Sequence, residues 1–225
     1  MRTRSLDKCC SVGDSLMLSL NEIGLKHGTD KASNVHDYLN FYEKRLAHLR
    51  EESFTLFEIG VYQGASVRMW EEFFPNATIV GLDINPATQA AEAGRIKMRI
   101  GDQSSVKFLF SVINEFGPPR IVIDDGSHRW DHQIQTLNIL LPFVPAGGRY
   151  IVEDIHTSSD HMKKDYQGFS QVSGFEYLSR LSHLICTHDV AGPSEIFDNF
   201  LYSHYQEIES VEFARRTAII NKKSF

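Results

Sequence analysis

The feature that most constrains the fold is a short apolar run that ends in two spaced glycines. Residues 56–59 are apolar apart from one acid, Glu58, and Gly60 and Gly64 follow them. Residues 65–74 then repeat apolar side chains at helical spacing. This order predicts a strand, a glycine turn and a helix. Because glycine has no Cβ, backbone at such a turn can reach positive φ or lie directly against a ligand.

The spacing of these glycines also indicates a class of ligand. Dinucleotide-binding folds use G-x-G-x-x-G, whose additional glycine lets a pyrophosphate approach the helix N-terminus. The pair Gly60 and Gly64 lacks that spacing, which favours a nucleoside ligand without phosphates and makes an NAD-dependent dehydrogenase a weak alternative. An ordinary strand–helix turn without a ligand is the other interpretation.

The alternation of strand and helix continues along the chain and predicts an α/β fold. We expect further strands at 77–83, 97–100, 120–125 and 147–154, and helices at 86–94, 106–116 and 132–141. This rhythm is typical of a doubly wound, Rossmann-like, mostly parallel sheet. Residues 208–222 form two more apolar runs around a polar turn at Arg215, which predicts an antiparallel C-terminal hairpin and seven strands in all.

Acids at the predicted strand ends suit a nucleoside. Asp83 ends the second strand about 20 residues after the glycine turn, where a carboxylate holds a ribose diol in nucleotide-binding α/β units. Asp102 and Gln103 end the third strand and can contact an adenine amino group. Helix capping by Asp102 or Ser104 is an equally good explanation.

Other residues complete the predicted cofactor site. Glu58 and Ser66 flank the glycine turn, and a polar cluster at Thr29 and Lys31 precedes the first strand. Short polar residues in such a cluster can close over a ligand, although a solvated turn fits them as well.

Carboxylates gather at the ends of the fourth and fifth strands. These strands are neighbours in sheets of this type, so Asp125, Glu153 and Asp154 are expected to meet and repel one another. A divalent cation such as Mg²⁺ resolves this repulsion, and we predict that these three acids bind it, with Asp124 turned toward the cofactor or the backbone. The alternative is that some of them cap helices or pair with arginines, namely Arg120, Arg129 and Arg149.

Two histidines follow these acids. His128 lies three residues beyond Asp125, and His156 lies two residues beyond Asp154. A histidine beside a metal that holds a hydroxyl group is well placed to take its proton, so we predict His128 as a general base, with His156 as second choice and Asp125 as its acidic neighbour.

Composition excludes several function classes. The net charge of -6, from 29 acids and 23 Lys+Arg, argues against tight binding to nucleic-acid phosphates. No apolar run reaches the ~20 residues that a membrane span requires. The start of the sequence has no apolar leader, and Cys9, Cys10 and Cys186 lack disulfide or metal-ligand spacing, which predicts free thiols in the cytoplasm.

The motifs carry a family resemblance. The pattern Glu58-x-Gly60-x-x-x-Gly64, with Asp83 and Gly101-Asp102, resembles the cofactor half of class I S-adenosylmethionine-dependent methyltransferases. Three further stretches are similar to the metal-dependent sugar O-methyltransferases that tailor macrolide and tetracenomycin-type glycosides: Gly28-Thr-Asp-Lys31, Asp124-Asp-Gly-Ser-His128 and Glu153-Asp154. The resemblance covers roughly residues 25–157.

The resemblance implies an enzyme that uses S-adenosylmethionine and Mg²⁺, or another divalent cation, to methylate a hydroxyl of a sugar or glycoside. It places the metal on Asp125, Glu153 and Asp154 and the base at His128, and it suggests natural-product or polysaccharide biosynthesis. One alternative is a catechol-type small-molecule O-methyltransferase, whose flat acceptor would need an aromatic gate such as Trp130, Tyr166 or Phe169. Another is a non-catalytic cofactor-binding module.

We expect a single methyltransferase domain across residues 1–225. Its predicted parts are an N-terminal helical lead-in (1–52), a cofactor and metal core (53–157), a substrate lid (158–205) and the closing hairpin (206–225). Aromatic residues in the lid and the tail suggest a homodimer or a larger homo-oligomer.

Overall fold

The computed structural model describes residues 17–187 and 198–224. Within these ranges one seven-stranded sheet has the order β3-β2-β1-β4-β5-β7-β6. The strands are β1 (Thr55–Ile59), β2 (Thr78–Asp83), β3 (Ile96–Ile100), β4 (Ile121–Asp124), β5 (Arg149–Val152), β6 (Ile208–Ala214) and β7 (Thr217–Lys222). The first five strands are parallel, and β7 pairs antiparallel with both β5 and β6. The predicted mostly parallel sheet with a C-terminal hairpin is confirmed.

Helices connect the strands. The α-helices are α1 (Leu20–His27), α2 (Leu39–Leu46), α3 (Ala65–Phe73), α4 (Val106–Phe116), α5 (Trp130–Leu140), α6 (Lys163–Tyr166), α7 (Gly174–Thr187) and α8 (Asn199–His204). Short 3₁₀ turns are η1 (Ala47–Leu49), η2 (Pro86–Ala91), η3 (Leu141–Phe143), η4 (Ile155–Ser158), η5 (Asp160–Met162) and η6 (Tyr205–Glu207). The helix expected at 86–94 is thus a 3₁₀ turn, which Pro86 begins and Asn85 caps through its side chain.

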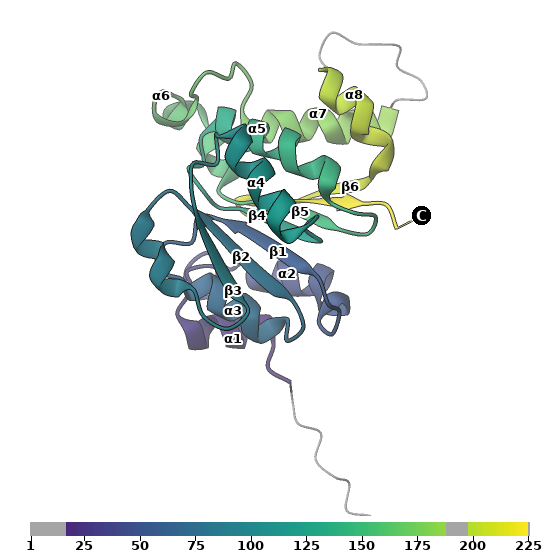
Figure 1. Cartoon of the computed structure of the whole chain (residues 1–225). Coiled ribbons are helices and arrows are strands. Elements are labelled where there is room, and N and C mark those ends of the chain that lie inside the picture. Colours follow the sequence, from purple (N-terminus) through teal and green to yellow (C-terminus); the bar gives the residue numbers. More distant parts are fainter. Residues whose placement is uncertain (1–16, 188–197, 225) are drawn as a thin grey trace, which may run out of the picture.

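Helices cover both faces of the sheet, as the view of the chain shows (Figure 1). Because side chains alternate along a strand, Leu56 packs with α1, α2 and α3, whereas Phe57 packs with α4, α5 and α7. Both faces are fully buried, which explains why the central strands read as continuous apolar runs.

The N-terminal helices form part of the lower layer. A capping box between Ser19 and Glu22 begins α1, and Gly28 ends it in the left-handed conformation. Of the cysteines, Cys186 is a free thiol, and Cys9 and Cys10 lie outside the described residues. Among the described helices, none has the length and apolar character needed to cross a membrane.

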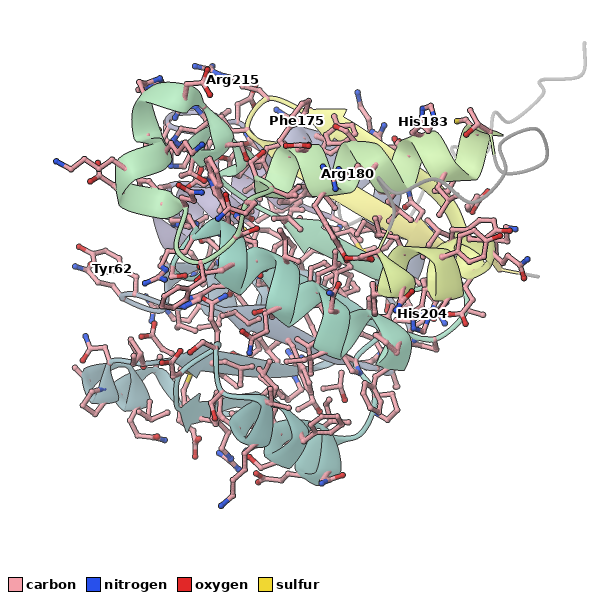
Figure 2. All side chains as sticks on the ribbon, turned by 90° about the horizontal axis from the view of Figure 1, so that it is seen from above. Tyr62, Phe175, Arg180, His183, His204 and Arg215 are labelled. Carbon is pink, nitrogen blue, oxygen red and sulfur yellow. The ribbon has the colours of Figure 1, made fainter. Side chains whose placement is uncertain are left out.

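The segment expected as a lid, residues 158–205, includes a helix that is packed into the core. Tyr177 and Leu181 of α7 are buried against the sheet, and α7 contacts α5 and β6, so this helix belongs to the core. Figure 2 shows Phe175, Arg180 and His183 along the length of α7. The turn η4 directly follows β5, and its Thr157 hydroxyl donates to the carbonyl of His128 at 3.0 Å. Residues 188–197 of the expected lid are outside the described ranges. A lid function for the segment stays a prediction.

The chain reverses its winding direction between β1 and β4. It runs outward from β1 through β2 to β3 and then returns to place β4 on the other side of β1. In open α/β sheets, ligands bind at the carboxyl ends of the strands beside such a reversal. The loops after β1 and β4 are therefore the place to look for a site.

Candidate active site

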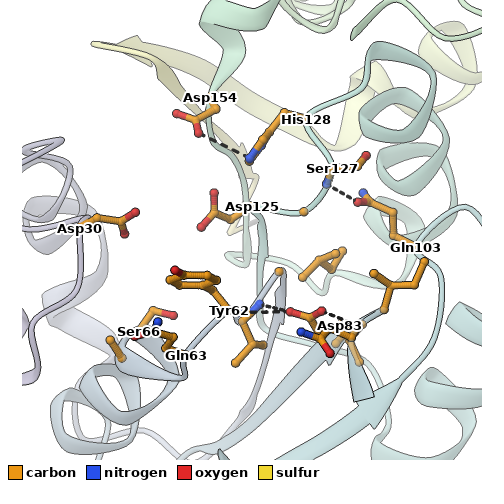
Figure 3. A pocket seen from close by; sticks show the side chains of 18 of the residues that line it. Asp30, Tyr62, Gln63, Ser66, Asp83, Gln103, Asp125, Ser127, His128 and Asp154 are labelled. Atoms are coloured by element: carbon orange, nitrogen blue, oxygen red, sulfur yellow. Dashed lines mark hydrogen bonds and ion pairs between the residues drawn. The ribbon is translucent and has the colours of Figure 1, made fainter. Parts of the chain in front are cut away.

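A pocket of about 580 Å³ lies at this point, formed by the loops that follow β1, β2, β3 and β4 together with residues 28–31. Seven of the ten predicted cofactor residues line it: Thr29, Lys31, Gly60, Ser66, Asp83, Asp102 and Gln103. The other three, Glu58, Gly64 and Asp124, are not among its lining residues. Figure 3 shows labelled side chains around this space, with Asp154, His128 and Asp125 above Tyr62 and Asp83.

The glycine turn brings two loops into contact. Gly60 has φ +84°, and a Cβ there would lie 2.0 Å from the backbone oxygen of Asp125. The amide of Asp125 in turn donates to the carbonyl of Ile59 at 2.9 Å. Only glycine permits this approach, so Gly60 fixes where Asp125 stands relative to the pocket.

Asp83 holds the same turn. Its Oδ2 accepts the backbone N–H groups of Val61 at 2.8 Å and Tyr62 at 3.1 Å, and its Oδ1 accepts that of Asn85 at 2.8 Å. Oδ2 thus accepts two hydrogen bonds and Oδ1 only one, so Oδ1 keeps a lone pair for a ribose hydroxyl.

Asp102 and Gln103 have different surroundings. Oδ1 of Asp102 accepts both the backbone N–H and the hydroxyl of Ser104, which lowers the pKa of Asp102. Gln103 is buried, and its amide donates to Asp124 at 3.1 Å while its oxygen accepts the N–H of Ser127 at 2.7 Å. Gln103 therefore positions the loop after β4, a role that its sequence position did not reveal.

Asp124 faces the interior and not the cofactor pocket. Besides Gln103, it lies 3.5 Å from the Tyr150 hydroxyl. Burial raises the pKa of Asp124 to about 7, against the opposing hydrogen bond from Gln103.

Asp125, His128 and Asp154 meet at the pocket wall. One potential ligand atom from each lies within 4.8 Å of the others, and all three residues line the pocket (Figure 3). His128 Nε2 is 3.6 Å from Asp154 Oδ2, and His128 Nδ1 is buried without a hydrogen-bond partner. Two carboxylates with open coordination positions suit Mg²⁺, which keeps several sites for water or substrate. The donor set therefore fits a divalent cation.

Two of these residues have unusual backbone. His128 has φ +57° and Asp154 has φ +54°, the left-handed region that non-glycine residues rarely occupy. Such conformations cost energy and cluster at functional sites, where they aim side chains.

The structure does not bring Glu153 into this group, although the sequence assigned it to the metal. Glu153 is buried, and its oxygens accept from Lys31 Nζ at 2.7 Å and from the Tyr42 hydroxyl at 3.0 Å. Burial raises the pKa of Glu153, as does Asp125, while Lys31 opposes the rise. The cation beside Glu153 in this structure is thus an ammonium group.

Lys31 and Glu58 were both expected to contact the cofactor, and both are instead buried. Lys31 lies 2.5 Å from Asp125 Oδ2 and 3.6 Å from Glu58 Oε1. Glu58 is fully buried, and its oxygens lack hydrogen-bond partners. Burial raises the pKa of Glu58 to about 7, although the Lys31 charge acts in the opposite direction. Lys31 lines the pocket and Glu58 does not.

The arginines offered as alternative partners do not engage the strand-end acids in the described ion pairs. Arg129 pairs with Asp131, and Arg120 lies 4.0 Å from Glu52. His156 lies 3.6 Å from Asp154 but does not line the pocket, so His128 is the better-placed base.

Sequence reasoning missed two tyrosines. Tyr38 donates its hydroxyl hydrogen to Asp154 Oδ1 at 2.8 Å. Tyr62 has φ +51°, is 82% exposed and lines the pocket mouth, and Figure 2 shows it projecting from the edge of the molecule. In the sequence, the position of Tyr62 between Gly60 and Gly64 was the feature that could have identified it as a pocket residue.

The aromatic gate expected for a catechol acceptor is not formed at this pocket. Trp130 is buried and donates its indole N–H to the carbonyl of Thr157 at 2.9 Å. Phe169 is exposed and lines a separate groove with Asp131, and neither Tyr166 nor Phe169 lines the main pocket.

Comparisons with known proteins agree with the resemblance seen in the motifs. Demethylmacrocin O-methyltransferase from Streptomyces fradiae is 37% identical over 146 residues, which are 62% of this chain and 37% of that protein. Mycinamicin VI 2''-O-methyltransferase from Micromonospora griseorubida is 36% identical over 146 residues, 62% of this chain and 36% of that protein. No protein-family model matches the sequence.

A solved structure is similar over most of the chain. The MycE methyltransferase from the mycinamycin biosynthetic pathway, in complex with Mg, SAH and mycinamycin VI, is 28% identical with a TM-score of 0.78. The match covers 93% of this chain and 56% of that one. The chain therefore spans a little over a third of the length of the curated relatives it matches and about half of this structure. The resemblance to sugar O-methyltransferases and the methyltransferase fold are confirmed.

Proposed function

We propose that this chain is an S-adenosylmethionine-dependent, divalent-cation-dependent O-methyltransferase that acts on a hydroxyl of a sugar or glycoside. The observation that carries the proposal is that Asp125, His128 and Asp154 converge at the wall of the pocket that the glycine turn and Asp83 form. The candidate metal ligands therefore lie beside the pocket proposed for the cofactor. Methyl transfer to a hydroxyl group bound to the metal would require this proximity. The sugar O-methyltransferases to which the chain is similar support the same reaction.

Each residue has a part in this reaction. S-adenosylmethionine supplies a sulfonium methyl group, and a divalent cation bound beside it makes an alcohol more acidic. Asp125 and Asp154 would hold the cation, whereas Glu153, which the sequence also assigned to it, accepts hydrogen bonds from Lys31 and Tyr42. His128 accepts the hydroxyl proton, a contribution on the order of 10²–10⁴-fold. Gly60, Ser66, Asp83 and Asp102 hold the nucleoside and orient the donor.

The test is an Asp125→Asn variant, which keeps the shape of the side chain. Methyl transfer from S-adenosylmethionine to a panel of glycosides should be lost, while calorimetry should still detect S-adenosylhomocysteine binding. Asp160→Asn, an exposed acid outside the pocket, is the matched control and should retain activity. Full activity of Asp125→Asn, or of the native protein in excess EDTA, would rule out the metal role.

The same assay decides between acceptors. Glycosides and catechols are offered in parallel, and methylation of catechols alone would replace the sugar acceptor by an aromatic one. Binding of S-adenosylhomocysteine without any product would favour a non-catalytic module. A cytoplasmic location and a homodimer or larger homo-oligomer remain predictions from the sequence.

A further inference from the structure

Lys31 carries the most buried positive charge near the site. Its side chain is 1% exposed, and its ammonium group touches two carboxylates, Asp125 at 2.5 Å and Glu153 at 2.7 Å, with Glu58 at 3.6 Å. Burial disfavours this ammonium, but the three acids outweigh that effect and raise the pKa of Lys31. The lysine is therefore charged and cannot be a solvated turn residue.

Hydrogen bonds around Lys31 stabilise its buried charge. Tyr42 donates to the other oxygen of Glu153 at 3.0 Å and lies 2.8 Å from the hydroxyl of Thr217 on β7. A buried charge is tolerated only when it is paired and hydrogen-bonded. This network meets that condition for Lys31 and Glu153. Glu58 lies outside it: burial raises the pKa of Glu58, and its polar side-chain neighbours Ser66 and Trp70 oppose that rise.

We propose that Lys31 is a tethered cation that offsets the charge of Asp125 and Glu153 and so sets the negative charge available to the divalent ion. The inference rests on the proposed function, because that function places the ion at Asp125. One ammonium group faces three carboxylates here. Adding or removing one of these charges therefore changes the electrostatic attraction that the site exerts on a divalent ion. Lys31 does not touch the reacting atoms and acts through Asp125.

The proposal predicts two effects of opposite sign. Lys31→Met removes the tethered cation and leaves three acids for a divalent ion to neutralise, so Mn²⁺ should bind at least tenfold more tightly. Glu58→Gln, studied at pH 8, removes one negative charge beside Lys31, so Mn²⁺ should bind several-fold more weakly. Glu58 neither lines the pocket nor belongs to the metal group, so a merely structural role predicts no change.

The experiment titrates Mn²⁺ by electron paramagnetic resonance, without S-adenosylmethionine or acceptor, and records the melting temperature with EDTA and with saturating Mg²⁺. The Mg²⁺-induced rise in melting temperature should be larger in Lys31→Met than in the native protein. Lys222→Met is the matched control, because Lys222 is also buried and paired, with Glu207 at 2.5 Å, and lies outside the pocket. It should lower stability without changing Mn²⁺ affinity.

The Mn²⁺ affinities of the native protein and the two variants decide whether Lys31 has this role. Equal Mn²⁺ affinity in the native protein, Lys31→Met and Glu58→Gln overturns the role of Lys31 while leaving the proposed function intact. If Lys31→Met does not fold with or without Mg²⁺, the Glu58→Gln result alone decides. A native protein that binds no divalent ion overturns the metal-dependent function itself, which is a different result.

Discussion

The hydroxyl of Tyr38 donates a hydrogen bond to Asp154 Oδ1 at 2.8 Å, and so ties the segment before α2 to the end of β5. The same segment contributes Lys31, which contacts Asp125. Both acids of the candidate metal group are thus held from one stretch of chain, residues 31–38. The two contacts differ in kind, because Tyr38 orients Asp154 by a hydrogen bond whereas Lys31 acts on Asp125 through its charge. Loss of a group that orients a metal ligand typically costs roughly 10- to 100-fold in metal affinity.

We expect Tyr38→Phe to weaken divalent-cation binding about 10- to 100-fold, because Asp154 loses the donor that orients it. Isothermal titration with Mg²⁺ or Mn²⁺ measures the effect. Tyr42→Phe is the matched variant, since Tyr42 donates to Glu153 instead. A larger loss in Tyr42→Phe than in Tyr38→Phe would show that Glu153 and not Asp154 is the dominant ligand.

Gly60→Ala should disrupt both the turn and the placement of Asp125. Alanine at φ +84° costs about 1–2 kcal/mol, and its Cβ would also lie 2.0 Å from the Asp125 backbone oxygen. Gly28→Ala isolates the first effect, because Gly28 has φ +72° but open space around its Cβ. Thermal unfolding should show a clearly larger loss for Gly60→Ala, together with loss of S-adenosylhomocysteine binding; equal losses would contradict the contact.

Glu58 predicts a particular pH dependence of stability. Its pKa rises from the usual 4.5 to about 7 in the folded state, chiefly through burial. The folded protein therefore binds a proton that the unfolded chain has released, and this group's contribution to stability is lost as pH rises from about 4.5 to about 7. The loss is on the order of 3 kcal/mol. Urea unfolding at several pH values should show a flatter profile for Glu58→Gln, and parallel profiles would refute the assignment.

His128→Gln separates metal binding from proton transfer. If His128 acts as the base, Mn²⁺ affinity should stay within about threefold while kcat falls on the order of 10²–10⁴-fold. The activity that remains should rise with pH, because solvent hydroxide then takes the proton. A loss of Mn²⁺ affinity equal to that of Asp125→Asn would instead identify His128 as a ligand.

Sequence reasoning succeeded where local pattern determines structure. The strand–glycine–helix unit, the apolar central strands and the hairpin around Arg215 each depend on neighbours in sequence, and all appear in the structure. Asp125 and Asp154 lie close together with His128, as expected for the ends of neighbouring parallel strands, whereas Glu153, the third acid predicted to bind the metal, is not in this group.

It failed where the answer depended on three-dimensional neighbours. Glu58 looks like a pocket residue in the sequence but is buried and does not line the pocket. Lys31 does line the pocket, but its ammonium group is buried against Asp125 and Glu153, which are distant in the chain. Helix α7 falls within the segment predicted as a lid, and the sequence pattern did not reveal that Tyr177 on this helix is buried in the core. The hydrogen bond from Tyr38 to Asp154 joins residues that no local pattern relates.

The left-handed backbone of His128 and Asp154 has a practical consequence for protein engineering. Replacing either residue by glycine relieves the conformational strain, so a selection for thermal tolerance alone would favour such changes. Variants selected in this way would be thermally stable but would lack methyltransferase activity. Among the described non-glycine residues with positive φ, three line the pocket (Tyr62, His128 and Asp154) and two do not (Asp37 and Arg216). A map of the positions where glycine increases heat resistance would therefore mark the pocket wall together with two positions outside it.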